Sequence, residues 1–192
     1  MRPTKLGIYS IYAALRGVKV MAFEPHFANY FQLCINIMLN NLQDLVTPLC
    51  FALCGGKSVD IISLASLDFG ASMATFGSDR DFRGAPFKPA FRQGMVGCDI
   101  DSLVTEFGVS PPHHLKIDVD GIELEIVRGG ARTIAADDVK SVSIERIETD
   151  HLQVTGVTDI LEKAGLHFVH KKQNPAFALP ETRDVLNFLY RR

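Results

Sequence analysis

Short apolar runs alternate along the chain with longer stretches whose apolar positions recur at helical spacing. The short runs, predicted as strands, cover residues 18–23, 46–53, 59–64, 114–119, 139–144, 166–170 and 185–189. The helical stretches cover residues 7–15, 27–42, 99–107, 123–129 with a continuation or restart through 134, and 157–164. This alternation is typical of an α/β fold on a mostly parallel sheet. The last two strands are predicted to form a terminal pair, joined by a loop that contains Pro175 and Pro180.

The segment 66–97 departs from this alternation. Glycine and proline interrupt it repeatedly, at Gly70, Gly77, Gly84, Pro86, Pro89 and Gly94. Because these residues favour turns, the segment is predicted to be a long loop or insertion. Long loops inside compact domains are usually functional, so a role in the choice of substrate is expected here. A tolerated surface insertion is the alternative.

Length and composition fit one globular domain over residues 1–192, since single domains commonly have about 100–150 residues. The net charge of −2 gives no electrostatic reason to expect nucleic acid or a membrane surface as partner. No apolar stretch reaches the roughly 20 residues that span a bilayer, and the first residues do not resemble a secretory signal. The four cysteines form no CxxC pair, which favours a reduced, cytoplasmic protein.

Carboxylates stand where several predicted strands end. Glu24 follows the first of these strands, Asp118 and Asp120 lie at the end of the strand 114–119, and Glu145 directly follows the strand 139–144. Ligands of open α/β sheets bind at the carboxyl ends of the strands. A carboxylate such as Glu24 can accept both hydroxyls of a ribose, so these acids are the candidate site residues.

The run KIDVDGIE at 116–123 is the densest of these clusters. Strand alternation directs Lys116, Asp118 and Asp120 to one side, and acids beside a lysine at a strand end indicate a site. A purely structural alternative is a Lys116–Asp118 ion pair, with Asp120 capping the following helix.

Four runs in this order resemble the FkbM-type methyltransferases. They are VMAFEP at 20–25, followed by Asn36 and Asn40 on the next helix, then LKIDVDGIE at 115–123, VSIE at 142–145 and VLNFL at 185–189. The resemblance extends from about residue 6 to the end of the chain. It implies a Rossmann-like class I methyltransferase sheet with an antiparallel terminal strand pair.

The resemblance also implies a chemistry, namely methylation of hydroxyl groups on sugars, glycolipids or polyketides with S-adenosylmethionine as cofactor. By this analogy Glu24 holds the ribose, and Gly7 and Ser10 are the remaining half of the glycine loop beside the methionine moiety. Asp118, Asp120 and Glu145 are the catalytic candidates for removing the proton of a small-molecule acceptor hydroxyl. A divalent cation such as magnesium on these acids would serve the same purpose, and the sequence leaves its presence open.

The match fails at the first five residues. The family loop reads approximately Asp-x-Gly-Ala-Asn-x-Gly-x-x-Ser, whereas this chain places Met1, Pro3 and Lys5 at the acid, first glycine and asparagine positions. The first strand is therefore predicted to be missing, which weakens cofactor binding and exposes strand edges that favour self-association into a homo-oligomer. A miscalled start, a decaying gene and replacement by another segment are the three explanations.

Other functions fit less of the sequence. An inactive remnant or pseudoenzyme that keeps the fold for a structural or interaction role is the main alternative. A nicotinamide-dependent oxidoreductase could use Glu24 equally well, but the chain has no GxGxxG run. A metal-dependent hydrolase on Asp118, Asp120 and Glu145 lacks an HxH or DxH ligand set.

Overall fold

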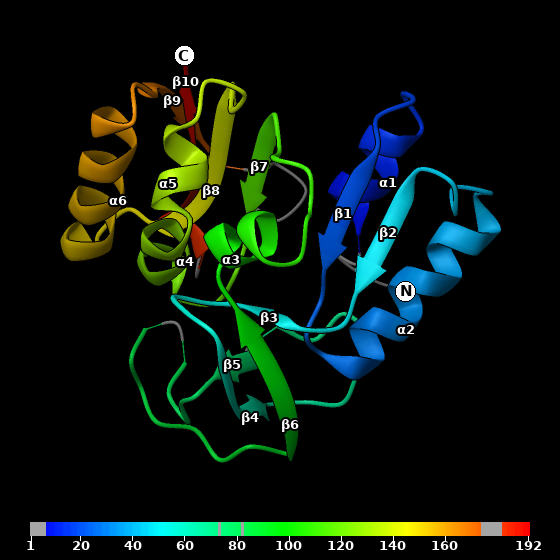
Figure 1. Ribbon diagram of the computed structural model, residues 1–192. Coiled ribbons are helices and arrows are strands. Elements are labelled where there is room, and N and C mark those ends of the chain that lie inside the picture. Colours follow the sequence, from blue (N-terminus) through cyan, green and yellow to red (C-terminus); the bar gives the residue numbers. More distant parts are fainter. Residues whose placement is uncertain (1–6, 73, 82, 174–181) are drawn as a thin grey trace. The chain divides into compact units, whose positions relative to one another are not determined.

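The computed structural model of the protein describes residues 7–72, 74–81, 83–173 and 182–192 (Figure 1). Its internal contacts divide the chain into two compact units. Unit 1 comprises Met1–Leu53 and Ser58–Gly97, and unit 2 comprises Cys54–Lys57 and Cys98–Arg192. The single domain expected over 1–192 stays a prediction. Two features used in the sequence-based predictions lie outside the described residues. They are the mismatch at residues 1–5, from which the loss of a first strand is predicted, and the loop prolines Pro175 and Pro180.

Unit 1 begins with a strand–helix layer. Strands β1 (Val20–Phe23) and β2 (Val46–Leu49) pair in parallel, and helices α1 (Ile8–Ala14) and α2 (Phe27–Leu39) pack against them. The apolar side chains that the sequence places at strand and helical spacing meet in one cluster, formed by Ala14, Ala22, Leu33, Ile37, Leu42 and Val46. The predicted order of helix, strand, helix and strand is confirmed here.

Gly7 precedes α1 in a backbone conformation that glycine tolerates best. Its φ is 75°, and a Cβ added there would lie 2.3 Å from Cδ1 of Leu33. We expect Gly7→Ala to lower the free energy of unfolding by roughly 2–4 kcal/mol, because left-handed strain and crowding add. Gly17, with φ 79° and no atom within 4 Å of an added Cβ, is the matched control. Gly17→Ala should lower the free energy of unfolding by only about 1 kcal/mol, from backbone strain. If urea unfolding shows the same loss for both variants, the crowding at Gly7 is contradicted.

A second sheet of unit 1 has the order β3-β6-β4-β5. Its strands are β3 (Ala52–Leu53), β4 (Ser58–Leu64), β5 (Ala74–Phe76) and β6 (Phe91–Cys98), and β4 runs antiparallel to both β5 and β6. One face buries a cluster formed by Ala52, Ile62, Leu64 and Met95.

This sheet corrects two sequence-based predictions. The single strand predicted over 46–53 is two strands in different sheets, and the loop predicted over 66–97 contains β5 and nearly all of β6. Glycines in β6 lower its local strand preference, and pairing with β4 along its length overrides that preference. The segment is therefore partly sheet. Its first residues are held to α2, since Asn29 Oδ1 accepts from the Gly70 amide at 2.8 Å and Asn29 Nδ2 donates to the Ala71 carbonyl at 3.1 Å.

Unit 2 contains one sheet of order β7-β8-β10-β9. Strands β7 (His114–Ile117) and β8 (Ser141–Ile147) are parallel, whereas β10 (Val185–Arg191) runs antiparallel to both β8 and β9 (His167–Lys172). The predicted α/β class and the antiparallel terminal pair are confirmed. A mostly parallel sheet is too simple a description, because β4 and β10 each add antiparallel pairs.

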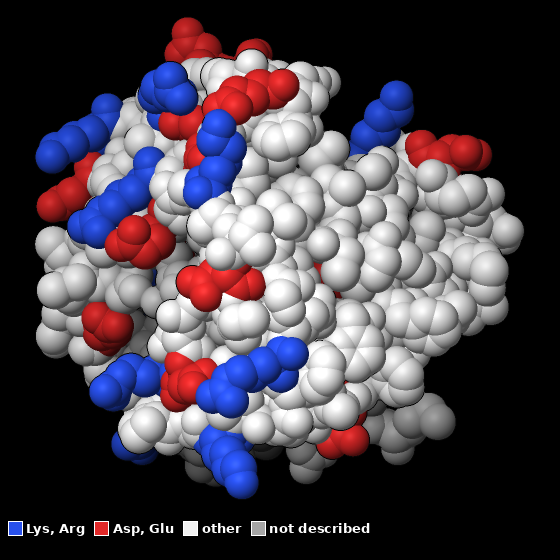
Figure 2. All heavy atoms as spheres, turned by 60° about the horizontal axis from the view of Figure 1, so that its bottom comes forward, with Lys and Arg blue, Asp and Glu red and all other residues white. Residues whose placement is uncertain are grey.

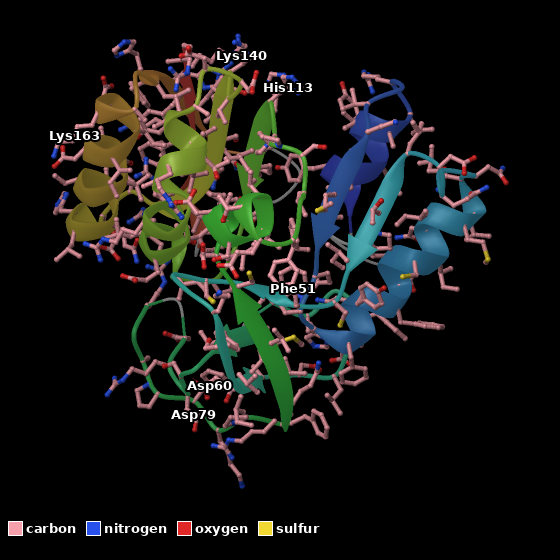
Figure 3. All side chains as sticks on the ribbon, in the orientation of Figure 1. Phe51, Asp60, Asp79, His113, Lys140 and Lys163 are labelled. Carbon is pink, nitrogen blue, oxygen red and sulfur yellow. The ribbon has the colours of Figure 1, made fainter. Side chains whose placement is uncertain are left out.

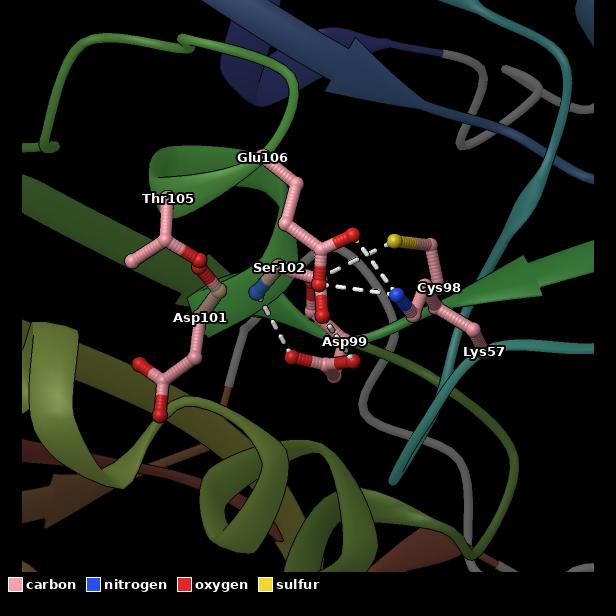
Figure 4. A network of polar contacts seen from close by, with 7 residues as sticks. All are labelled: Lys57, Cys98, Asp99, Asp101, Ser102, Thr105 and Glu106. Atoms are coloured by element: carbon pink, nitrogen blue, oxygen red, sulfur yellow. Dashed lines mark hydrogen bonds and ion pairs between the residues drawn. The ribbon is translucent and has the colours of Figure 1, made fainter.

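The helices of unit 2 are α3 (Ile100–Thr105), α4 (Glu123–Gly129), α5 (Ala131–Ala135) and α6 (His151–Lys163). In Figure 1, α4 to α6 lie over the sheet face on which β8 buries alternate side chains. Asp99 caps α3 by accepting from the Ser102 amide at 2.7 Å, as Figure 4 shows. Asp101 instead accepts from the Thr133 amide of α5 at 2.7 Å. Among the described helices, none has the length and apolar character needed to cross a membrane.

Candidate functional site

The turn after β7 carries the predicted acids of unit 2. β7 ends at Ile117, Asp118 and Asp120 follow it, and the chain turns at Gly121 with φ 98° before α4 begins. β7 ends two residues before the predicted bound of 119, so Asp118 follows the strand and does not lie inside it, while the prediction that both acids lie at a strand end is confirmed. Their catalytic role stays a prediction.

A further carboxylate, Glu123, lies beneath this turn. Glu123 is only 5% exposed, and its Oε1 accepts from the Gly121 amide at 3.3 Å. Burial raises the pKa of Glu123 to about 7, and the nearby charges of Asp120 and Asp118 act in the same direction. Sequence reasoning did not single out Glu123, although its position between apolar neighbours in a helix start was a signal for burial.

Gln153 of α6 holds the same turn from the other side. Its Nε2 donates to the Gly121 carbonyl at 2.8 Å, and its Oε1 accepts from the Leu124 amide at 3.0 Å. One side chain therefore satisfies backbone groups on both sides of Glu123. No sequence signal pointed to Gln153, which lies far from the turn along the chain.

Lys116 connects the acids of two strands. Its Nζ lies 3.5 Å from Asp118 Oδ2 and 2.5 Å from Asn187 Oδ1. Asn187 of β10 in turn donates from Nδ2 to Glu145 Oε1 at 3.1 Å. The Lys116–Asp118 ion pair considered from the sequence is present, and it belongs to a contact chain that also reaches Glu145.

The position of Glu145 differs from the prediction. Glu145 lies inside β8, which continues to Ile147, rather than directly after the strand. β8 extends beyond Glu145 because β10 pairs with it along its whole length, and the last of these pairs is Val185 opposite Ile147. Strand alternation places Glu145 on the face opposite Ile144 and Arg146, where its side chain is half-buried.

The cofactor candidates Gly7, Ser10 and Glu24 all belong to unit 1. Glu24 directly follows β1, as predicted, and its Oε1 accepts from the His26 amide at 3.0 Å. Its own amide donates to the Leu49 carbonyl at 3.0 Å, so the backbone there continues the β1–β2 pairing. Gly7 immediately precedes α1, and Ser10 lies in the first turn of that helix. The structure thus fixes Glu24 at the carboxyl end of a parallel strand.

Unit 1 also contains a polar hollow of about 300 Å³, which Asp60, Ser63, Asp79 and Arg92 help to line. Figure 3 labels Asp60 and Asp79, which lie near one another at this sheet. The Ser63 hydroxyl donates to Asp79, and Arg92 Nη2 lies 2.5 Å from Asp79 Oδ2. These two hydrogen bonds lower the pKa of Asp79.

On the face drawn in Figure 2, Lys and Arg are interspersed with Asp and Glu and form no extended patch of one sign.

The described residues contain no group of three or more His, Cys, Asp or Glu side chains arranged to hold a metal ion. This applies to Asp118, Asp120, Glu123 and Glu145 as well. No magnesium site is assigned to these acids.

A family model described as the methyltransferase FkbM domain matches residues 7–191. The chain belongs to the FkbM methyltransferase family. A crystal structure of methyltransferase FkbM from Methylobacillus flagellatus KT shares the fold, with a TM-score of 0.58 and 16% sequence identity. The match covers 97% of this chain and 42% of that one, so the chain spans less than half of its structural relative. Among curated proteins there is no significant match.

Proposed function

We propose that this FkbM-family chain transfers a methyl group from S-adenosylmethionine to a hydroxyl of a small molecule such as a sugar, glycolipid or polyketide. The observation that carries the proposal is the family match over residues 7–191, which contains both Glu24 and the acids after β7. We further propose that its strands follow the Rossmann-like class I arrangement. The four cysteines are free thiols, which supports a reducing, cytoplasmic location.

Cofactor binding is assigned to Gly7, Ser10 and Glu24. The fit is best at Glu24, because a carboxylate held by the His26 amide at a strand end has the acceptor chemistry that a ribose diol requires. When bound, S-adenosylmethionine supplies the activated methyl group. The chain's own contribution is to hold and orient the reactants, which accounts for much of the rate in such displacements.

The acceptor hydroxyl must also lose a proton, and we assign this step to the group Asp118, Asp120 and Glu145. The Asp118 side chain is 31% exposed, so it can meet a ligand, whereas Glu123 at 5% exposure cannot contact one directly. We assign the choice of acceptor to the segment 66–97. Asp79 and Arg92 from this segment line the polar hollow of unit 1, and their donors and acceptors suit a hydroxylated ligand.

Calorimetric titration of the full chain with S-adenosylmethionine tests the cofactor assignment. We expect Glu24→Gln to weaken binding at least tenfold, because hydrogen bonds to a charged acceptor contribute roughly 1.5–3 kcal/mol. Asp44→Asn, which removes one negative charge from an exposed position in unit 1, should leave the affinity unchanged. Equal affinities of the Glu24→Gln variant and the wild type would refute the role of Glu24. Absence of binding by the wild type at millimolar cofactor would favour a non-catalytic member of the family.

A further inference from the structure

A chain of polar contacts crosses three strands of the unit 2 sheet. It runs from Asp118 to Lys116 on β7, from Lys116 over β8 to Asn187 on β10, and from Asn187 back to Glu145 on β8. Asn187 is the central member, since it contacts both Lys116 and Glu145. In the sequence, Asn187 stood out only as a member of the last strand.

The strand register explains how Lys116 reaches Asn187. Lys116 stands opposite Ser143 on β8, and Glu145, two residues further along β8, stands opposite Asn187. These side chains share one face of the sheet because directly opposed residues point the same way. Neighbouring strands lie about 4.8 Å apart, so a lysine chain can pass over a small residue such as Ser143 to the second strand. A bulky side chain at 143 would block this path.

The contacts also fix the orientation of the Asn187 amide. The Lys116 ammonium has only donors, so it must face Oδ1 of Asn187, at 2.5 Å. The amide nitrogen is then directed at Glu145 Oε1, which accepts at 3.1 Å. An asparagine at position 187 can accept a hydrogen bond from Lys116 and donate one to Glu145 at the same time. Aspartate would repel the Glu145 carboxylate, and leucine could hydrogen-bond to neither neighbour.

We propose that Asn187 is a positioning residue that holds Lys116 against Asp118 and orients the Glu145 carboxylate. Its importance for methyl transfer rests on the proposed function, in which Asp118 and Glu145 are candidate proton acceptors. Among the described residues, the charged groups linked to Glu145 through Asn187 are Lys116, which bonds to Asn187 and pairs with Asp118, and the exposed Lys172, which stands opposite Asn187 on β9.

NMR titration of the full chain, labelled with ¹³C at the Asp and Glu carboxyl groups, tests the proposal without any ligand. We expect Asn187→Asp to raise the titration midpoint of Glu145 by about one pH unit or more, because two carboxylates would then face each other. Asn187→Leu should alter the titration of Glu145, because the hydrogen bond from the Asn187 amide is lost. Asn40→Asp, the same substitution at an exposed position of unit 1, should leave the titration of Glu145 unchanged.

A titration of Glu145 that matches the wild type in the Asn187→Leu variant would overturn the positioning role. If the variants do not fold, the contact between Lys116 and Asn187 can be tested in the wild type. The measured quantity is then the rate at which the Lys116 ammonium protons exchange with water. Slow exchange supports the contact with Asn187, and exchange as fast as that of the exposed Lys163 excludes it. The titration does not depend on cofactor binding, so its failure is distinct from failure of the calorimetric test of Glu24.

Discussion

Glu123→Gln is expected to stabilise the protein at pH 8 by about 3 kcal/mol and to lose this advantage near pH 4.5. The pKa of Glu123 in the folded protein, about 7, lies above the ordinary value of 4.5. Between these values the folded state binds more protons than the unfolded state, so the free energy of unfolding falls as the pH rises. Above pH 7 the native protein bears the full cost of a buried carboxylate. Glutamine removes that cost and still offers an oxygen to the Gly121 amide.

Urea unfolding at several pH values between 4.5 and 8 measures this difference. Glu125→Gln is the matched control, since Glu125 lies exposed on the same helix and its pair with Arg128 is a surface contact. The control should change stability by less than about 1 kcal/mol. A difference between wild type and Glu123→Gln that stays constant over this pH range would show that Glu123 does not titrate there.

Arg146→Ala is expected to destabilise the protein by about 3–5 kcal/mol, whereas Arg146→Met should stay within about 1–2 kcal/mol of the wild type. Arg146 is 3% exposed, donates to the Val154 carbonyl at 3.0 Å and to the Tyr190 hydroxyl at 2.6 Å, and covers the Phe188 ring at 4.2 Å. Alanine leaves a cavity at this position. Methionine fills most of the volume and no longer requires a charge to be buried.

Two partners of Arg146, the Val154 carbonyl and the Tyr190 hydroxyl, keep a hydrogen bond when Arg146 is removed. The Thr158 hydroxyl donates to the Val154 carbonyl and lies 2.7 Å from the Tyr190 hydroxyl, so neither group is left unpaired by methionine. Arg128→Ala, at an exposed position of α4, is the control and should cost less than about 1 kcal/mol. Thermal unfolding distinguishes the cases. If methionine destabilises as much as alanine, the polar contacts rather than the packing volume of Arg146 hold α6 to the sheet.

Local patterns predicted most elements of the fold. Helical spacing over 27–42 predicted α2, and the apolar run at 114–119 predicted β7, because each pattern lies within one short run of the chain. The prediction was wrong where pairing partners decide the structure. β6 is a strand because it pairs with β4, and Glu145 lies within β8 because β10 extends the pairing to Ile147.

The sequence by itself determined the family, the α/β class and the placement of Glu24, Asp118 and Asp120 at strand ends, since each depends on a short run of neighbouring residues. Only the tertiary structure decided which side chains meet these acids. Lys116 and Asn187 are 71 positions apart, and Gln153 reaches the turn at Gly121 from 32 positions away. Such contacts follow from strand register and helix docking, which no local pattern encodes. The burial that raises the pKa of Glu123 has the same origin, because it depends on the whole layer packed around one carboxylate.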